Sequence, residues 1–403
     1  MAKTGERDFR LDFCRGVALI VIFIDHVPGN PLSNWTLRNF FFCDAAEVFV
    51  LISGMASYLA YGSHFDRMGF GACAKAVGRR WLKIYFAHLL LLAVIAGLIV
   101  WVSHTFTDFD YLEWLKLKWL VEDPKGAIFS AATLRYMPRL IDILPLYMIL
   151  LMIAPLLIAT VKWDYRVALL VSAALYAFAW LGGWNLNADK YGREWYLNPF
   201  SWQFLYTVGM TVTHLSRTAP HKLPSDRRWL LLSAAFLVLA TLVAWPLNQL
   251  GLTQVAPFSY IWPADKTYLA PLRVLNVLAL LYVFVSFVSP HAGWLKHRAA
   301  EVLISCGRHS LPIYALGLVL SCLGYVFIQE TGSTTIGHLA VNAFGISALI
   351  VVATMLDRLR ESRRPVSVAP AVETARPAPL FEPAPVPVNA PAFYRLRGTT
   401  ALR

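Results

Sequence analysis

Long apolar segments separated by shorter polar ones run through most of the chain. A segment of about 18 apolar residues can cross a hydrocarbon core of roughly 30 Å as a helix. In lipid the backbone must satisfy its own polar groups, which favours helices for segments of this length. The pattern predicts an all-α, polytopic integral membrane bundle of about ten transmembrane helices. They are expected at residues 11–28, 41–62, 81–103, 138–161, 166–183, 198–214, 229–247, 268–289, 306–328 and 338–357.

The distribution of Lys and Arg orients these helices. With a cytoplasmic N-terminus, the inner segments together hold 20 Lys and Arg residues and the outer segments hold 8, although the outer segments are longer in total. Because cytoplasmic loops carry the excess of positive charge, both termini are predicted to be cytoplasmic. The net charge of +12 is then a consequence of topology, and no nucleic-acid partner is expected.

The polar segments carry further predictions. Residues 65–80 are too polar to span and are expected to lie along the inner interface. The long outer segment 104–137 could form a short amphipathic cover over an outer cavity. Residues 1–360 are expected to form the membrane domain, and the Pro- and Ala-rich residues 361–403 a disordered cytoplasmic tail. No small-residue cleavage site follows the first apolar segment, so this helix is expected to be retained.

The composition supports these predictions and narrows the chemistry. Of the 403 residues, 58% are hydrophobic and 15% are charged, whereas soluble domains carry about a quarter charged residues. The five cysteines form no paired spacing, so neither a metal site nor a disulfide framework is indicated. The chain has no P-loop, nucleophile elbow, zinc-protease motif or dinucleotide fingerprint.

Two polar side chains stand on the first predicted helix. Arg15 and His26 are eleven residues apart, which places them about 20° apart around the helix and roughly 16 Å apart along it. Polar groups within spans are costly and are therefore candidates for function. The alternative is that Arg15 extends to lipid phosphates and that His26 is a satisfied interfacial residue.

Carboxylates on two helices accompany His26. Asp25 precedes it, and Asp44 and Glu47 stand three residues apart in the outer half of the second helix. Such carboxylates could orient and charge an imidazole, as a general base requires. A simple interhelical ion pair is the structural alternative.

Other polar residues within the predicted helices form two groups. Arg79, Arg80 and Lys83 open the third helix at the inner surface, where they could meet a phosphorylated ligand or simply mark topology. The second group lies in the outer half and is expected to line a cavity and contact the substrate: Asn198, Trp202, Gln203, Arg273 and Asn276.

Several separate motifs resemble the acyltransferase-3 superfamily of integral membrane acyltransferases, and in particular its OpgC branch. They are the Arg-x10-His pattern of the first helix, "AAEVFVLISG" on the second, and "DILPLYMILL", "NPFSWQFLYTVG" and "GRHSLPIY" further on. The likeness is spread over most of residues 8–328. The founding members of this branch succinylate osmoregulated periplasmic glucans.

The resemblance implies roles for individual residues. His26 would be the catalytic histidine, Arg15 its partnered arginine, and Glu47 the acidic residue of the second motif. Members of the family typically show Arg-x-x-Arg at the third helix, proposed to bind the acyl donor. The matching positions here are Arg80 and Lys83, with Arg79 alongside. Lysine keeps the charge but lacks the fork that binds phosphate in a bidentate manner.

The implied function is O-acyl transfer in a bacterial inner membrane. An acyl-CoA would serve as co-substrate, with succinyl-CoA as the candidate and with no bound cofactor or metal. The acceptor would be a periplasmic glucan or another envelope glycan. Arg273 is the candidate cation for a succinyl carboxylate. The alternative is a transporter or exporter of an envelope glycan, which the absence of an apparent internal repeat and the Arg-x10-His pattern disfavour.

Overall fold

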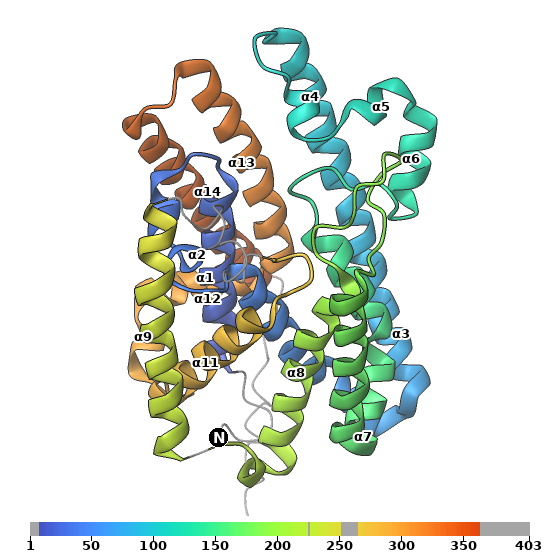
Figure 1. Ribbon diagram of the computed structural model, residues 1–403, viewed down its shortest axis with the longest axis vertical. Helices are drawn as coiled ribbons and strands as arrows, with labels where there is room; N and C mark the ends of the chain where they lie inside the picture. The colour runs from blue at the N-terminus through green and yellow to red at the C-terminus, as the bar shows by residue number, and fades with distance from the viewer. Residues whose placement is uncertain (1–7, 225, 251–264, 363–403) are drawn as a thin grey trace, which may run out of the picture. The chain divides into compact units, whose positions relative to one another are not determined.

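The computed structural model describes residues 8–224, 226–250 and 265–362, and in these residues the regular structure is helical apart from one bridge between Asn187 and Glu194. The elements, labelled in Figure 1, are α1 (Phe9–His26), η1 (Pro31–Trp35), α2 (Leu37–Phe40), α3 (Ala45–Thr105), α4 (Tyr111–Trp114), α5 (Lys118–Glu122), α6 (Pro124–Ala132), α7 (Ile143–Gly182), α8 (Pro199–Thr218), η2 (Pro220–Lys222), α9 (Arg227–Gln249), α11 (Pro271–Phe287), η4 (Gly293–Lys296), α12 (Arg298–Arg308), α13 (Ser310–Thr331) and α14 (Thr335–Ser362).

Five of these helices, α3, α7, α9, α13 and α14, are long and apolar enough to cross a membrane. Their length and composition indicate a membrane protein. The helical unit covers Met1–Leu359, and a second unit covers Arg360–Arg403. Of the predicted tail, only Glu361 and Ser362, at the end of α14, lie within the described residues.

The predicted helical segments are found in these helices, but two pairs of them are merged, and segment 306–328 begins at the end of α12 and continues past His309 into α13. Segments 41–62 and 81–103 both belong to α3, which has non-helical backbone angles at Gly69 (φ 79°, ψ −174°). Segments 138–161 and 166–183 both belong to α7, which is interrupted at Asp164. The two arms of α3 run in opposite directions on either side of the interruption (Figure 1). The number of membrane crossings and their orientation remain predictions.

The turn in α3 depends on a glycine. The left-handed φ of Gly69 is open to glycine at little steric cost and disfavoured for other residues. It lies within segment 65–80, which is helical on both sides of this point. Lys162, near the interruption of α7, binds the Asp66 carboxylate with N···O distances of 2.7 and 2.8 Å. An ion pair therefore joins the turns of the two interrupted helices.

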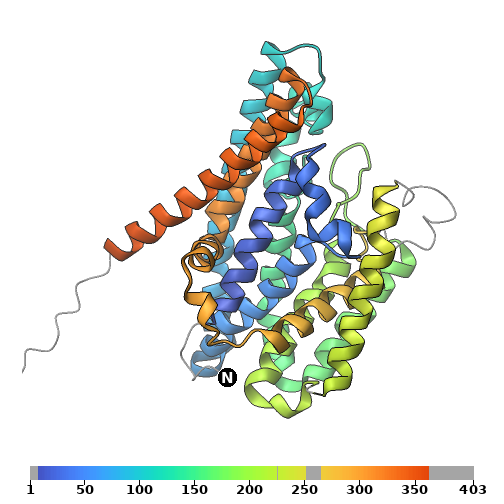
Figure 2. The same ribbon diagram turned by 90° about the vertical axis from the view of Figure 1, so that its left-hand side faces the viewer.

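Glycines allow the central helices to approach closely. α1 packs against α12, α13 and α3, and α3 packs against α7 and α8 (Figure 1, Figure 2). A Cβ on Gly54 of α3 would lie 2.1 Å from the Tyr206 carbonyl oxygen of α8, and one on Gly209 would lie 2.2 Å from the Leu51 oxygen. Small residues at helix interfaces allow such backbone contact in membrane proteins.

Gly54→Ala is therefore expected to destabilise the bundle. The methyl group would push α8 away from α3, and overpacking of this kind costs about 1–3 kcal/mol. Gly97→Ala is the matched control, because a Cβ at Gly97 of the same helix has no neighbour within 4 Å. The midpoint of thermal unfolding in detergent should fall for the first variant and not for the second. Equal midpoints would contradict the assigned contact.

The segment predicted to cover an outer cavity contains three short helices, α4, α5 and α6. Its end is tied to a second loop, because the backbone N–H of Met137 donates to the Ala188 carbonyl at 2.9 Å. A third loop is tied to the start of α8, where the N–H of Asn198 donates to the Thr267 carbonyl at 3.1 Å. These loops form much of the wall of the cavity described next.

Candidate active site

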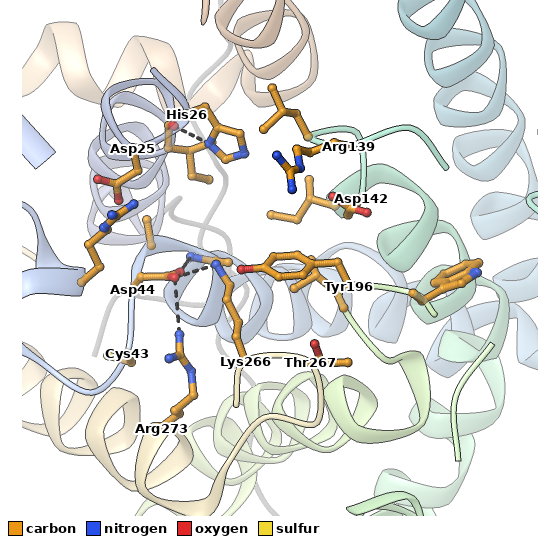
Figure 3. A pocket seen from close by; sticks show the side chains of 18 of the residues that line it. Asp25, His26, Cys43, Asp44, Arg139, Asp142, Tyr196, Lys266, Thr267 and Arg273 are labelled. Atoms are coloured by element: carbon orange, nitrogen blue, oxygen red, sulfur yellow. Dashed lines mark hydrogen bonds and ion pairs between the residues drawn. The ribbon is translucent and has the colours of Figure 1, made fainter. Parts of the chain in front are cut away.

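A cavity of about 730 Å³ lies where α1 ends and where α3, α7 and α11 begin (Figure 3). Its volume is within the range of small-molecule sites, about 300–1,000 Å³. Its wall is strongly charged, and its acidic and basic residues are Asp25, His26, Arg38, Asp44, Lys116, Arg139, Asp142, Arg193, Glu194, Lys266 and Arg273. Charged groups gathered at one place in an apolar helical protein indicate a functional site.

His26 is the last residue of α1, and its ring is held by its own helix. The ring Nδ1 lies 2.6 Å from the carbonyl oxygen of Ile22, one turn earlier. A carbonyl oxygen only accepts hydrogen bonds, so Nδ1 carries the hydrogen and donates it. The neutral imidazole then has its lone pair on Nε2, and His26 lines the cavity. The backbone thus fixes the tautomer that a general base needs.

Asp44 and Glu47 are placed by the start of α3. Asp44 is the N-cap residue, and its Oδ1 accepts from the N–H of Ala46 at 2.8 Å. The Glu47 Oε2 accepts from the N–H of Asp44 at 2.9 Å, which completes a capping box. The three-residue spacing noted in the sequence is therefore the spacing of a helix cap.

Two cations neutralise these carboxylates. Arg273, at the start of α11, donates through Nε to Glu47 Oε1 at 2.6 Å, and its Nη2 lies 3.4 Å from Asp44 Oδ2. The Lys266 Nζ binds the same Asp44 oxygen at 2.6 Å. Burial alone would lower the pKa of Lys266, but the Asp44 carboxylate raises it above its ordinary value, so the ammonium stays charged. Figure 3 shows this cluster below the imidazole.

The expected contact between a carboxylate and the imidazole is not present. Among the described residues, no hydrogen bond or ion pair joins His26 to Asp25, Asp44 or Glu47. The Asp25 carboxylate instead accepts from the Thr36 hydroxyl at 2.8 Å. Asp25 and Asp44 share the cavity with His26, whereas Glu47 is fully buried behind it.

The other predicted residues of the outer half support the cavity from behind. Trp202 Nε1 donates to the carbonyl oxygens of Lys266 and Thr267 at 3.1 and 3.2 Å. Asn198 caps α8 and accepts a hydrogen bond from Phe200. Gln203 links α8 to the Ser172 carbonyl of α7 at 2.8 Å. Asn276 accepts from the Cys43 thiol at 2.9 Å. None of the four predicted residues lines the cavity itself.

The predicted donor-binding residues lie outside this cavity. Arg79, Arg80 and Lys83 follow the Gly69 turn on the second arm of α3, with Arg79 and Lys83 exposed and Arg80 half-buried. Arg15 stands in the first half of α1, 3.9 Å from the Asp12 carboxylate. The structure therefore brings four of the predicted residues to one cavity: Asp25, His26, Asp44 and Arg273. The predicted cations Arg15, Arg79, Arg80 and Lys83 lie outside it.

Several cations of the wall were not anticipated from the sequence. Lys116, Arg139 and Arg193 come from loops between helices, and Arg38 comes from the short α2. In the sequence they resemble ordinary loop charges. Their convergence depends on how the loops fold back over the helices, and a helical period carries no information about that.

Comparison with protein families identifies a match over most of the chain. The family model described as OpgC protein matches residues 7–361. No curated protein matches the chain. The matched range contains the whole cavity wall.

Proposed function

The chain belongs to the OpgC family, and on this premise we propose that it is a membrane-bound O-acyltransferase of the acyltransferase-3 type. It transfers an acyl group, succinyl from succinyl-CoA, to hydroxyl groups of a periplasmic glucan or another envelope glycan. The protein resides in a bacterial inner membrane with about ten spans and both termini in the cytoplasm. The acceptor enters the cavity from the outer side.

The hydrogen bonding of the His26 ring is the observation that carries this proposal. Acyl transfer to a sugar needs a base that removes the hydroxyl proton at a fixed position. The Nδ1–Ile22 hydrogen bond of 2.6 Å leaves Nε2 as the only acceptor of the ring. His26 lines a cavity large enough for an acyl chain and a sugar ring. A transporter site has no need of an oriented base.

The proposed step moves one proton and one acyl group. Nε2 of His26 takes the proton of a sugar hydroxyl as that oxygen bonds to the thioester carbonyl carbon. The tetrahedral intermediate collapses with cleavage of the carbon–sulfur bond, and the proton passes from Nε2 to the departing coenzyme thiolate. The products are an ester and free coenzyme A. Cations in the wall stabilise the negative charge that develops on oxygen in the intermediate.

The remaining residues are assigned supporting roles. Arg273 and Lys266 neutralise Glu47 and Asp44 and so keep the start of α3 in place. Asp25 keeps α1 close to η1 and α2 through its bond to Thr36. Arg79, Arg80 and Lys83 would contact the phosphates of the acyl donor at the cytoplasmic side, where positive charge suits a polyanion. Arg15 keeps the role that the Arg-x10-His pattern implies, as the arginine partnered with His26.

Purified protein incubated with radiolabelled acyl-CoAs and a panel of glucans tests the proposal directly. Label should appear in the glucan as base-labile ester, and succinyl-CoA should be the better donor. Movement of unmodified glucan into proteoliposomes, without label transfer, would favour the exporter alternative. A strain lacking the protein but with unchanged acyl content in its glucans would exclude the glucan as acceptor.

A further inference from the structure

Within the part of the chain that the structure describes, Arg139 differs from most other cations of the cavity in having no hydrogen-bonded or ion-paired partner for its guanidinium. Arg273 and Lys266 bind the carboxylates at the start of α3. The other loop cations are also paired, Lys116 with Glu113 and Arg193 with Asp189. No hydrogen bond or ion pair of the Arg139 guanidinium is found within the described residues. Its side chain is exposed on the cavity wall.

Arg139 and His26 line the same cavity. Figure 3 shows the Arg139 guanidinium and the His26 imidazole among the side chains of this cavity, together with Asp142. Asp142 interacts electrostatically with Arg193 more than with Arg139. Arg38 is the other cavity cation without a hydrogen-bonded partner among the described residues, but its charge acts on Asp25 and on His26. Among the described residues, Arg139 is thus the cavity cation with the fewest partners for its charge.

The backbone presents Arg139 rigidly. Its N–H donates to the Leu115 carbonyl at 3.0 Å. The next residue, Leu140, has a left-handed φ of 75°, a costly conformation that persists where the surroundings enforce it. The Leu140 carbonyl accepts from the Tyr314 hydroxyl at 3.5 Å. The backbone at the base of the Arg139 side chain is thus held on both sides, and the guanidinium, without a partner among the described residues, is available to bind an anion.

We propose that Arg139 binds the free carboxylate of a dicarboxylic acyl group and so selects it over neutral acyl groups. The inference rests on the proposed acyltransferase function. A guanidinium binds carboxylate through two parallel hydrogen bonds. In a succinyl thioester the free carboxylate is two methylene groups from the reacting carbonyl, so a carbonyl placed at His26 brings it to a neighbouring cation. Arg273, the cation expected from the sequence, is occupied by Glu47.

Donor preference in purified protein tests this assignment. The experiment measures the ratio of kcat/KM for succinyl-CoA to kcat/KM for butyryl-CoA, which has a methyl group in place of the carboxylate. A neutral glucan serves as acceptor, so that charge on the acceptor plays no part. Arg139→Gln should lower this ratio about 10- to 100-fold, the effect of losing a charge-assisted hydrogen bond. Arg139→Lys should keep an intermediate ratio and is the second variant if the first does not fold.

Arg38→Gln is the matched control, since it removes the other cavity cation that has no hydrogen-bonded partner among the described residues. Its charge acts on His26, which would affect both donors alike, so the ratio should stay unchanged. An equal loss of transfer from both donors in Arg139→Gln would show that Arg139 acts on folding or on the chemical step, and would overturn the proposal. An unchanged ratio would overturn it as well. Wild-type protein that transfers neither acyl group would instead refute the acyltransferase function, and this inference with it.

Discussion

Replacement of His26 by glutamine is expected to lower acyl transfer by about 10²- to 10⁴-fold, the usual contribution of a positioned base. The glutamine amide can still donate to the Ile22 carbonyl, so α1 should keep its local hydrogen bonding. It has no basic nitrogen to accept the proton of the sugar hydroxyl. Transfer of labelled acyl groups measures the loss, and unchanged thermal unfolding in detergent establishes that the variant is folded.

His338 provides a close control for this substitution. Its Nδ1 lies 2.9 Å from the Thr334 carbonyl, also one turn earlier, and its side chain is 2% exposed. It does not line the cavity. His338→Gln should therefore keep transfer near the wild-type rate. Full activity in His26→Gln, or equal losses in both variants, would contradict a catalytic role for His26.

Arg273→Leu is expected to give the largest loss of stability. The Glu47 side chain is fully buried. Without the guanidinium, its carboxylate would keep the N–H of Asp44 as a hydrogen-bond donor and the more distant charge of Lys266. Removing one partner of a buried pair costs about 3–5 kcal/mol. The midpoint of thermal unfolding in detergent should fall accordingly, and acyl transfer should fall with it because Asp44 also loses a partner.

A double-mutant cycle separates the ion pair from simple loss of packing. Glu47→Leu combined with Arg273→Leu removes both charges, and the double variant should be more stable than the sum of the single effects predicts. A coupling of about 1 kcal/mol or more is expected for residues in direct contact. Additive effects would mean that the two side chains contribute independently, against the 2.6 Å contact.

The helices could be predicted from the sequence because the pattern of apolar residues shows which segments are long and apolar enough to cross a membrane as helices. The same argument could not foresee that two pairs of segments are joined. Gly69 and Asp164 permit a change of direction without a loop, and nothing in the apolar period distinguishes such a turn from an interfacial helix. The polar residues Asp44 and Arg273 were expected in one region, and they do meet.

The partners within the site were harder to predict. The sequence Asp-x-x-Glu before an apolar run is the pattern of a capping box, and it could have assigned Asp44 and Glu47 to the start of a helix. The Ile22 carbonyl as partner of His26 could not be found by searching for polar residues, because it belongs to the backbone. Arg139 lies in a loop whose position depends on distant contacts, so only the fold reveals it.

The hydrogen bond between His26 and Ile22 also determines the route of the proton. With Nδ1 bound to the backbone, the imidazole exchanges protons through Nε2 alone, and a proton must leave by the atom through which it arrived. The ring therefore cannot pass a proton from one of its nitrogens to the other. In the proposed reaction, the proton that Nε2 takes from the sugar hydroxyl is the same proton that it gives to the departing thiolate, and cleavage of the thioester supplies the driving force.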